Sequence, residues 1–151
     1  MTVSADVPVF VYGQASWAEG IGDKLTPVAP VEPWYLIVNP NVQISTEALF
    51  NVPELTRNTS PITIRDFMDG RSTNVFEPIA MARYPQVRKA LEFLAVNNRE
   101  RRAKMSGTGS CVFTAFDTEE KAQALFEKLP DDMSGYVVQG KNASPLYDFA
   151  G

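Results

Sequence analysis

The sequence contains no histidine and a single cysteine, Cys111. Without histidine, the chain cannot form a Ser-His-Asp or Cys-His catalytic group, and it lacks the side chain that most often binds metals. With one cysteine, it can form neither an internal disulfide nor a cysteine-rich zinc site. Catalysis by this chain would therefore depend on carboxylates, lysines, hydroxyl groups and backbone amides.

Long apolar runs and an excess of positive charge are also missing. No stretch approaches the roughly 18–20 consecutive apolar residues of a membrane span, and the N-terminus lacks the basic start and apolar run of a secretory signal. The 14 basic and 18 acidic side chains give a net charge of −4, which repels phosphate backbones. We expect a cytoplasmic protein with neither a membrane nor a nucleic acid as partner.

The length of 151 residues allows one domain with a core, or one domain and part of a second. Prolines spaced through residues 27–33 predict an extended linker and a domain boundary. Residues 1–30 hold short β-prone runs punctuated by glycine, which predict a β-meander too small for its own core. We therefore expect a meander over residues 1–30 and an α+β domain over residues 31–151.

Strand and helix patterns alternate in the second domain. Residues 34–38 form a continuous apolar run, as in a buried strand. Residues 85–94 place apolar side chains at i, i+3, i+4 and i+7, which is one face of an amphipathic helix. Further helical patterns lie at residues 45–50, 62–68, 74–84 and 118–129, and strand patterns at residues 104–105, 110–116 and 135–139. This order predicts the α+β class, with a ferredoxin-like sandwich of an antiparallel sheet and helices on one face.

A glycine-rich segment lies between two of the expected strands. Gly107 and Gly109 let the backbone turn tightly and leave amide N–H groups unobstructed, as in a nest that binds phosphate oxygens. Basic side chains precede it and raise the local potential for anions: Arg99, Arg101, Arg102 and Lys104. The same pattern also fits a simple hairpin turn, with the basic residues solvated near the end of a helix.

Two further residues have both a chemical and a structural interpretation. Asp6 precedes the apolar run at residues 7–11, and a carboxylate at the start of a strand can orient a hydroxyl group and take its proton. It can equally be a solvated turn residue. Phe50 can stack on the ring of a ligand or pack under the sheet. Spacing leaves both alternatives open for each residue.

Several motifs occur together and in a recognisable order. They include Ala-Asp-Val-Pro-Val-Phe at residues 5–10, Ala-Glu-Gly-Ile-Gly-Asp at 18–23, Ser-Gly-Thr-Gly-Ser-Cys at 106–111 and Asn-Ala-Ser-Pro-Leu at 142–146. They resemble the C-terminal half of the 4-diphosphocytidyl-2-C-methyl-D-erythritol kinase family. This family belongs to the galactokinase, homoserine kinase, mevalonate kinase and phosphomevalonate kinase (GHMP) superfamily. The resemblance extends over essentially the whole chain.

The resemblance implies an activity and a role for each candidate residue. The family transfers phosphate from ATP, with Mg²⁺, to the 2-hydroxyl of 4-diphosphocytidyl-2-C-methyl-D-erythritol in non-mevalonate isoprenoid biosynthesis. Asp6 matches the catalytic aspartate that deprotonates or orients this hydroxyl. Phe50 matches an aromatic side chain that flanks the cytosine ring, and Thr46 lies near it. The phosphate-proximal loop of the family is matched by Gly107, Thr108, Gly109 and Ser110.

Other parts of the family pattern have no counterpart in this sequence. These are the catalytic lysine, the glycine- and serine-rich loop that holds ATP, and the tyrosine and histidine of the cytosine pocket. We therefore expect the chain alone to be inactive and to bind no cofactor tightly. Its exposed N-terminal strands should fold onto the second domain, self-associate with another copy of the chain, or be mobile. Two alternatives stay open. One is a ferredoxin-like module that binds a nucleotide or a protein without catalysis, and the other is a truncation product.

Overall fold

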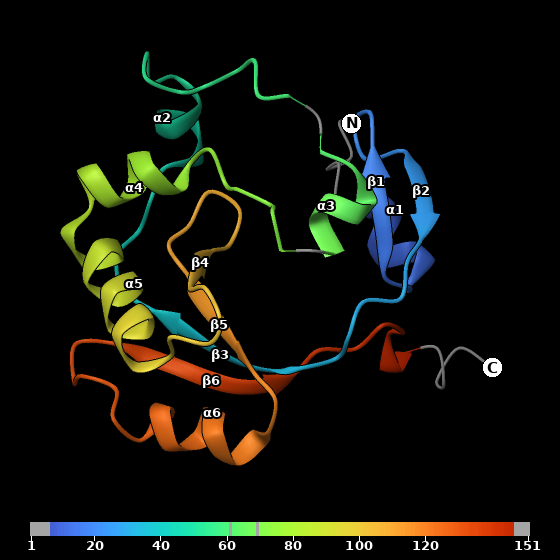
Figure 1. Ribbon diagram of the computed structural model, residues 1–151. Coiled ribbons are helices and arrows are strands. Elements are labelled where there is room, and N and C mark those ends of the chain that lie inside the picture. Colours follow the sequence, from blue (N-terminus) through green and yellow to red (C-terminus); the bar gives the residue numbers. More distant parts are fainter. Residues whose placement is uncertain (1–6, 61, 69, 147–151) are drawn as a thin grey trace. The chain divides into compact units, whose positions relative to one another are not determined.

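The computed structural model describes residues 7–60, 62–68 and 70–146. The chain forms two compact units: residues 33–139 make up the larger one, and the described residues of the smaller one are 7–32 and 140–146. Figure 1 shows the helices and strands of both units. No helix within the described ranges is long and apolar enough to cross a membrane.

The described part of the smaller unit includes a short helix and a hairpin. Its elements are α1 (Val7–Tyr12), β1 (Ser16–Glu19) and β2 (Lys24–Pro27). The strands β1 and β2 pair antiparallel, with Trp17 opposite Thr26. Gln14 forms an antiparallel bridge to Ala143. The segment 140–146 therefore pairs through its backbone with the segment 7–32 of the same unit.

The strand that the sequence predicts over residues 7–11 is wrong, because these residues form helix α1. Pro8 lies in the first turn of this helix, where a backbone N–H would have no helical partner and its loss has no cost. Gly13 has a φ of 66° and its N–H donates to the carbonyl of Val9 at 2.9 Å, which ends the helix. The positions of a proline at the start and a glycine just after the end therefore favour a helix more strongly than the β-branched residues between them favour a strand.

The larger unit is organised around a four-stranded sheet in the order β4-β5-β3-β6, with every neighbouring pair antiparallel. The strands are β3 (Trp34–Asn39), β4 (Lys104–Met105), β5 (Val112–Phe116) and β6 (Ser134–Gln139). In the central pair, Leu36 lies opposite Thr114. The turn between β4 and β5 extends beyond the sheet (Figure 1) and carries the glycine-rich segment.

Five helices lie among the described residues of the larger unit. They are α2 (Thr46–Phe50), α3 (Ile64–Met68), α4 (Glu77–Arg83), α5 (Pro85–Asn97) and α6 (Glu119–Phe126). Ser45 and Thr118 are N-caps whose side chains accept hydrogen bonds from N–H groups in the first turn of α2 and α6. The helix expected to reach residue 129 ends at Phe126, and one tight turn follows in which the Leu129 N–H donates to the Phe126 carbonyl at 3.0 Å.

The core of this unit lies between one face of the sheet and helices α4, α5 and α6. Side chains alternate along β3, so Leu36 and Val38 are fully buried in the core while Tyr35 and Ile37 point to the other face and are half-buried. The helices contribute Ala80, Val87, Ala90, Leu91, Leu94, Ala122 and Leu125. The apolar face predicted for residues 85–94 is therefore the face that is buried.

We predict that Leu36→Ala lowers the free energy of unfolding by about 2–5 kcal/mol, because it leaves a cavity in the core between sheet and helices. Ile37→Ala, one residue along the same strand, should cost under about 2 kcal/mol since its side chain is already partly solvated. Urea unfolding followed by circular dichroism measures both. Equal losses for the two variants would contradict the assignment of the buried face.

Candidate functional site

The glycine-rich segment is the turn that joins β4 to β5. The Ser106 N–H donates to the Cys111 carbonyl at 2.9 Å, and the Gly109 N–H donates to the Ser106 carbonyl at 2.8 Å. Gly107 and Gly109 have φ angles of 52° and 90°, in the left-handed region that favours glycine. We refer to residues 106–111 as the glycine turn.

Helix α2 contacts the glycine turn through two hydroxyl groups. The Oγ1 atoms of Thr46 and Thr108 lie 3.0 Å apart and share a hydrogen bond. Thr46 is the first residue of α2, directly after the capping Ser45. The structure thus brings together two predicted site residues that are 62 positions apart in the sequence.

Phe50 lies one turn after Thr46, at the end of α2. Its side chain is 51% exposed, and its ring meets the ring of Phe76 edge-on, with centroids 4.9 Å apart. The ring is therefore held on one side by Phe76 and open to solvent on the other. This arrangement suits a platform that stacks on a planar ligand better than a core position.

The segment that precedes α4 holds the glycine turn from a different direction. The Asn74 Nδ2 atom donates to the carbonyls of Met105 and Gly107 at 3.0 and 2.7 Å. The Oδ1 atom of Asn74 accepts from the Phe76 N–H at 3.0 Å. One carboxamide therefore connects the start of α4 to the last residue of β4 and to the second residue of the glycine turn.

Glu77 adds a second connection from α4 to the same strand end. The residue is buried, with 8% of its surface exposed. One oxygen, Oε2, accepts from the Met105 N–H at 2.8 Å, and the other, Oε1, lies 3.4 Å from an Arg102 nitrogen. A buried carboxylate is stable only when it is paired, and here both of its oxygens have partners.

Sequence analysis did not single out Asn74 or Glu77. Their Asn-x-x-Glu spacing at the start of a helix is close to a capping box, which would assign both side chains to local backbone groups. In the structure their partners include Met105 and Gly107, which are 28–33 residues away. The Asn-x-x-Glu spacing was the signal in the sequence that could have drawn attention to both residues, but it does not specify their distant partners.

Two pockets border the Glu77–Arg102 ion pair. One, of about 240 Å³, lies beside the glycine turn and is lined by Asn74, Glu77, Arg102, Lys104 and Gly107 among others. Lys104 Nζ donates there to Ser72 Oγ at 2.8 Å. The lining next to the turn therefore combines the basic groups of Arg102 and Lys104 with hydroxyl groups and with the carboxylate of Glu77, which is paired with Arg102.

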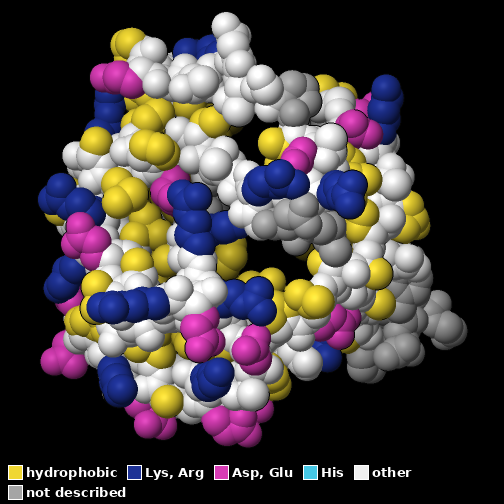
Figure 2. Space-filling model, viewed as in Figure 1, with side chains coloured by type: hydrophobic (Ala, Val, Ile, Leu, Met, Phe, Trp, Pro, Cys, Tyr) yellow, Lys and Arg dark blue, Asp and Glu magenta, His cyan; other side chains and the backbone are white. Residues whose placement is uncertain are grey.

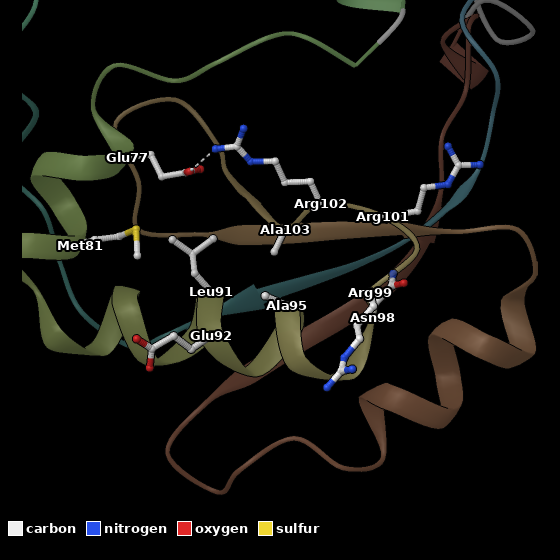
Figure 3. A pocket seen from close by; sticks show the side chains of 10 residues that line it. All are labelled: Glu77, Met81, Leu91, Glu92, Ala95, Asn98, Arg99, Arg101, Arg102 and Ala103. Carbon is white, nitrogen blue, oxygen red and sulfur yellow. Dashed lines mark hydrogen bonds and ion pairs between the residues drawn. The ribbon is translucent and has the colours of Figure 1, made fainter.

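The other pocket, of about 570 Å³, lies between α4, α5 and the segment before β4. Figure 3 shows the ion pair of Glu77 and Arg102 at its upper edge, with Leu91 and Ala103 below it. Of the basic residues that the sequence connects with the glycine-rich segment, Arg99, Arg101 and Arg102 line this pocket. The predicted substrate-binding and loop residues do not line it.

Charge is mixed on the one face of the molecule that Figure 2 shows, where basic and acidic side chains lie among one another. Among the residues that the structure describes, no three or more Asp, Glu, Cys or His side chains gather where they could hold a metal ion. Anion binding near the glycine turn would therefore depend on nearby groups, because the chain as a whole is acidic.

Two predicted site residues remain. Ser110 lines a third pocket, of about 630 Å³, together with Gly109, Cys111 and Asn41 among others. Asp6, the predicted catalytic carboxylate, lies outside the described residues, so its place in the site stays a prediction.

The antiparallel sheet, its helical layer and the glycine turn define a C-terminal domain of the GHMP kinase type. The family described as GHMP kinases C terminal matches residues 53–135, which is more than half of the chain. The chain therefore belongs to this family.

Named relatives agree with this assignment. The chain is 49% identical over 151 residues to a 4-diphosphocytidyl-2-C-methyl-D-erythritol kinase of Halorhodospira halophila, covering 97% of this chain and 51% of the relative. It is 46% identical over 148 residues to the kinase of the same name from Shewanella denitrificans, covering 98% and 51%. The chain spans about half the length of these curated relatives.

Solved structures show the same fold. A crystal structure of 4-(cytidine 5'-diphospho)-2C-methyl-D-erythritol kinase superposes with a TM-score of 0.75 at 20% identity, covering 90% of this chain and 53% of that one. Homoserine kinase from Cytophaga hutchinsonii gives a TM-score of 0.61 at 16% identity, covering 91% and 51%. At these identities the likeness establishes the fold alone.

We predict that Gly109→Ala destabilises the chain more than Gly107→Ala. A Cβ at Gly109 would come within 2.9 Å of both Ile44 and Met105, whereas one at Gly107 meets nothing within 4 Å. Gly107→Ala should cost about 1–2 kcal/mol from its left-handed backbone, and Gly109→Ala about 2–4 kcal/mol because crowding adds to the strain. Urea denaturation tests the order, and a smaller loss for Gly109→Ala would refute it.

Proposed function

We propose that this chain forms the C-terminal part of a cytoplasmic, ATP-dependent kinase. The substrate is the 2-hydroxyl of 4-diphosphocytidyl-2-C-methyl-D-erythritol, in non-mevalonate isoprenoid biosynthesis. The observation that carries this proposal is the contact between Thr46 and Thr108. It joins the helix matched to cytosine recognition with the turn matched to the phosphates, in a chain whose relatives bear the name of this kinase.

The glycine turn suits a group that carries phosphate. A Cβ at Gly107 would meet no atom within 4 Å, so the backbone there is open to close approach. Arg102 and Lys104 border the adjacent pocket and supply positive potential to a region of an acidic chain. ATP, bound by the whole enzyme, supplies the transferred phosphoryl group, and this turn would hold part of its charge.

Phe50 and Thr46 would bind the substrate from α2. The exposed face of Phe50 offers a stacking surface for the cytosine ring, and its contact with Phe76 fixes the tilt of that surface. The Thr46 hydroxyl, already bonded to Thr108, can bind a second polar group because a hydroxyl both donates and accepts. Substrate and phosphate would thereby be oriented by one connected set of side chains.

The remaining roles are proposals by resemblance. Asp6 would deprotonate or orient the reacting hydroxyl. The described residues offer no cluster of carboxylates for Mg²⁺, so they give no support for a metal site in this part of the enzyme. The sheet order, with strands and helices in the sequence βαββαβ, supports a ferredoxin-like assignment for residues 33–139. The meander boundary at residue 30 and self-association through β1 and β2 stay predictions.

We predict no measurable turnover from the chain alone, because the family's lysine and ATP-holding loop have no counterpart in it. The assay follows ADP release from ATP with 4-diphosphocytidyl-2-C-methyl-D-erythritol. Addition of a polypeptide that spans the first half of the Halorhodospira halophila relative should produce turnover. Activity of the chain alone at the level of an intact kinase would refute the first expectation. A co-purifying but inactive mixture would contradict the proposed function.

A binding module without catalysis is the second candidate function. It is favoured by one observation, namely that the glycine turn, α2 and the pocket of about 240 Å³ all lie within the larger unit. Saturable NMR shifts at residues 107–109 with cytidine diphosphate or ATP, and no turnover in the mixture, would support this alternative.

We predict that Phe50→Leu, in the same mixture, raises the KM for the cytidine substrate by about 5- to 150-fold. The reason is the loss of ring stacking, which contributes about 1–3 kcal/mol in comparable sites. Phe67→Leu, another exposed aromatic position on α3, is the matched control and should leave KM unchanged. An unaltered KM in Phe50→Leu, with the fold intact by circular dichroism, would remove Phe50 from the substrate site.

A further inference from the structure

We infer that Asn74 is a positioning residue for the glycine turn: its carboxamide holds the carbonyls of Met105 and Gly107 and thereby directs the Thr108 N–H away from α4, where an anion can reach it. The role of that N–H in binding phosphate rests on the proposed function. The hydrogen bonds from Asn74 to the turn are independent of the proposed function, because they follow from the contacts alone.

The carboxamide of Asn74 is fully used. Both hydrogens of Nδ2 have acceptors, the carbonyls of Met105 and Gly107, and Oδ1 accepts the Phe76 N–H. These partners also fix which end of the side chain is oxygen, since Oδ1 faces a donor and Nδ2 faces two acceptors. Asn74 is also half-buried, so neighbouring atoms restrict its side chain to this orientation.

The contact with Gly107 determines the direction of the next amide. In a trans peptide the C=O and N–H groups point in opposite directions, and the cis bond recorded among the described residues joins Gly109 to Ser110 instead. Because the Gly107 carbonyl points to Asn74, the Thr108 N–H points away from it. This N–H has no acceptor among the described residues, so it is available to a ligand.

Glu77 holds the same strand end through the preceding peptide group. It accepts the Met105 N–H at 2.8 Å, while Asn74 donates to the Met105 carbonyl at 3.0 Å. Both polar backbone groups of the last residue of β4 are therefore bonded to the start of α4. The turn that follows begins from a fixed strand end, and Asn74 is the side chain that reaches past it into the turn.

Two substitutions of Asn74 separate its hold on the turn from its hydrogen bond to the start of the helix. Asn74→Asp keeps an oxygen for the Phe76 N–H but loses both donors to the turn and places a carboxylate against two carbonyls. The matched control is Asn97→Asp, because the Nδ2 of Asn97 donates to the Phe93 carbonyl within α5. Asn74→Ser, which is uncharged, also retains an acceptor for the helix but is too short to reach the two carbonyls.

The experiment records amide spectra and hydrogen exchange of the 151-residue chain without ligand. We expect Asn74→Asp and Asn74→Ser to speed exchange of the bonded Ser106 and Gly109 N–H groups by about tenfold or more, because two hydrogen bonds are lost. Asn97→Asp should leave these amides unchanged. Ser106 and Gly109 amides in both Asn74 variants that match those of the unsubstituted chain would overturn the inference.

A titration with inorganic pyrophosphate separates this inference from the proposed function. We expect a saturable shift of the Thr108 amide in the unsubstituted chain and in Asn97→Asp, and binding about tenfold weaker in Asn74→Ser. Equal binding by Asn74→Ser would overturn the link between Asn74 and anion binding. A turn that loosens in both Asn74 variants, with no pyrophosphate shift even in the unsubstituted chain, would count against the phosphate role while confirming the hold of Asn74 on the turn.

Discussion

The attachment of the glycine turn to the start of α4 is the constraint on which the rest of the site depends. A turn with two glycines has many accessible backbone conformations, and a site that recognises a ligand needs one of them. Here the carboxamide of Asn74 and the buried carboxylate of Glu77 bond the backbone groups that lead into the turn. The conformational freedom that glycine provides is thereby limited to the part of the turn after Gly107.

The sheet determines where this turn can act. Alternation along β3 and β5 buries one face under α4, α5 and α6, so the β4–β5 hairpin is anchored in the core by Met105 and Val112. The turn therefore extends from a rigid base. Through Thr108 it meets α2, which carries Thr46 and Phe50. Under the proposed function, this arrangement would let this half of the kinase orient the substrate while the other half binds ATP.

Much of the larger unit could be predicted because its signals are local. The helical patterns at residues 45–50 and 85–94 correspond to α2 and α5, and the apolar spacing of Val87, Ala90 and Leu94 marks the buried face of α5. Helix α1 was missed because its β-branched content was weighed above the positions of a proline and a glycine. Asn74 and Glu77 were missed for a different reason: their partners are distant in sequence, and no local pattern specifies which loop a polar side chain will reach.

The central claim is that the start of α2 and the tip of the glycine turn form one site. The most direct test is a nuclear Overhauser measurement between the side-chain protons of Thr46 and Thr108 in the isotope-labelled chain. Since their Oγ1 atoms lie 3.0 Å apart, the account predicts a clear cross-peak between the two residues. Ordered spectra for α2 and for the turn, with no cross-peak between them, would contradict it.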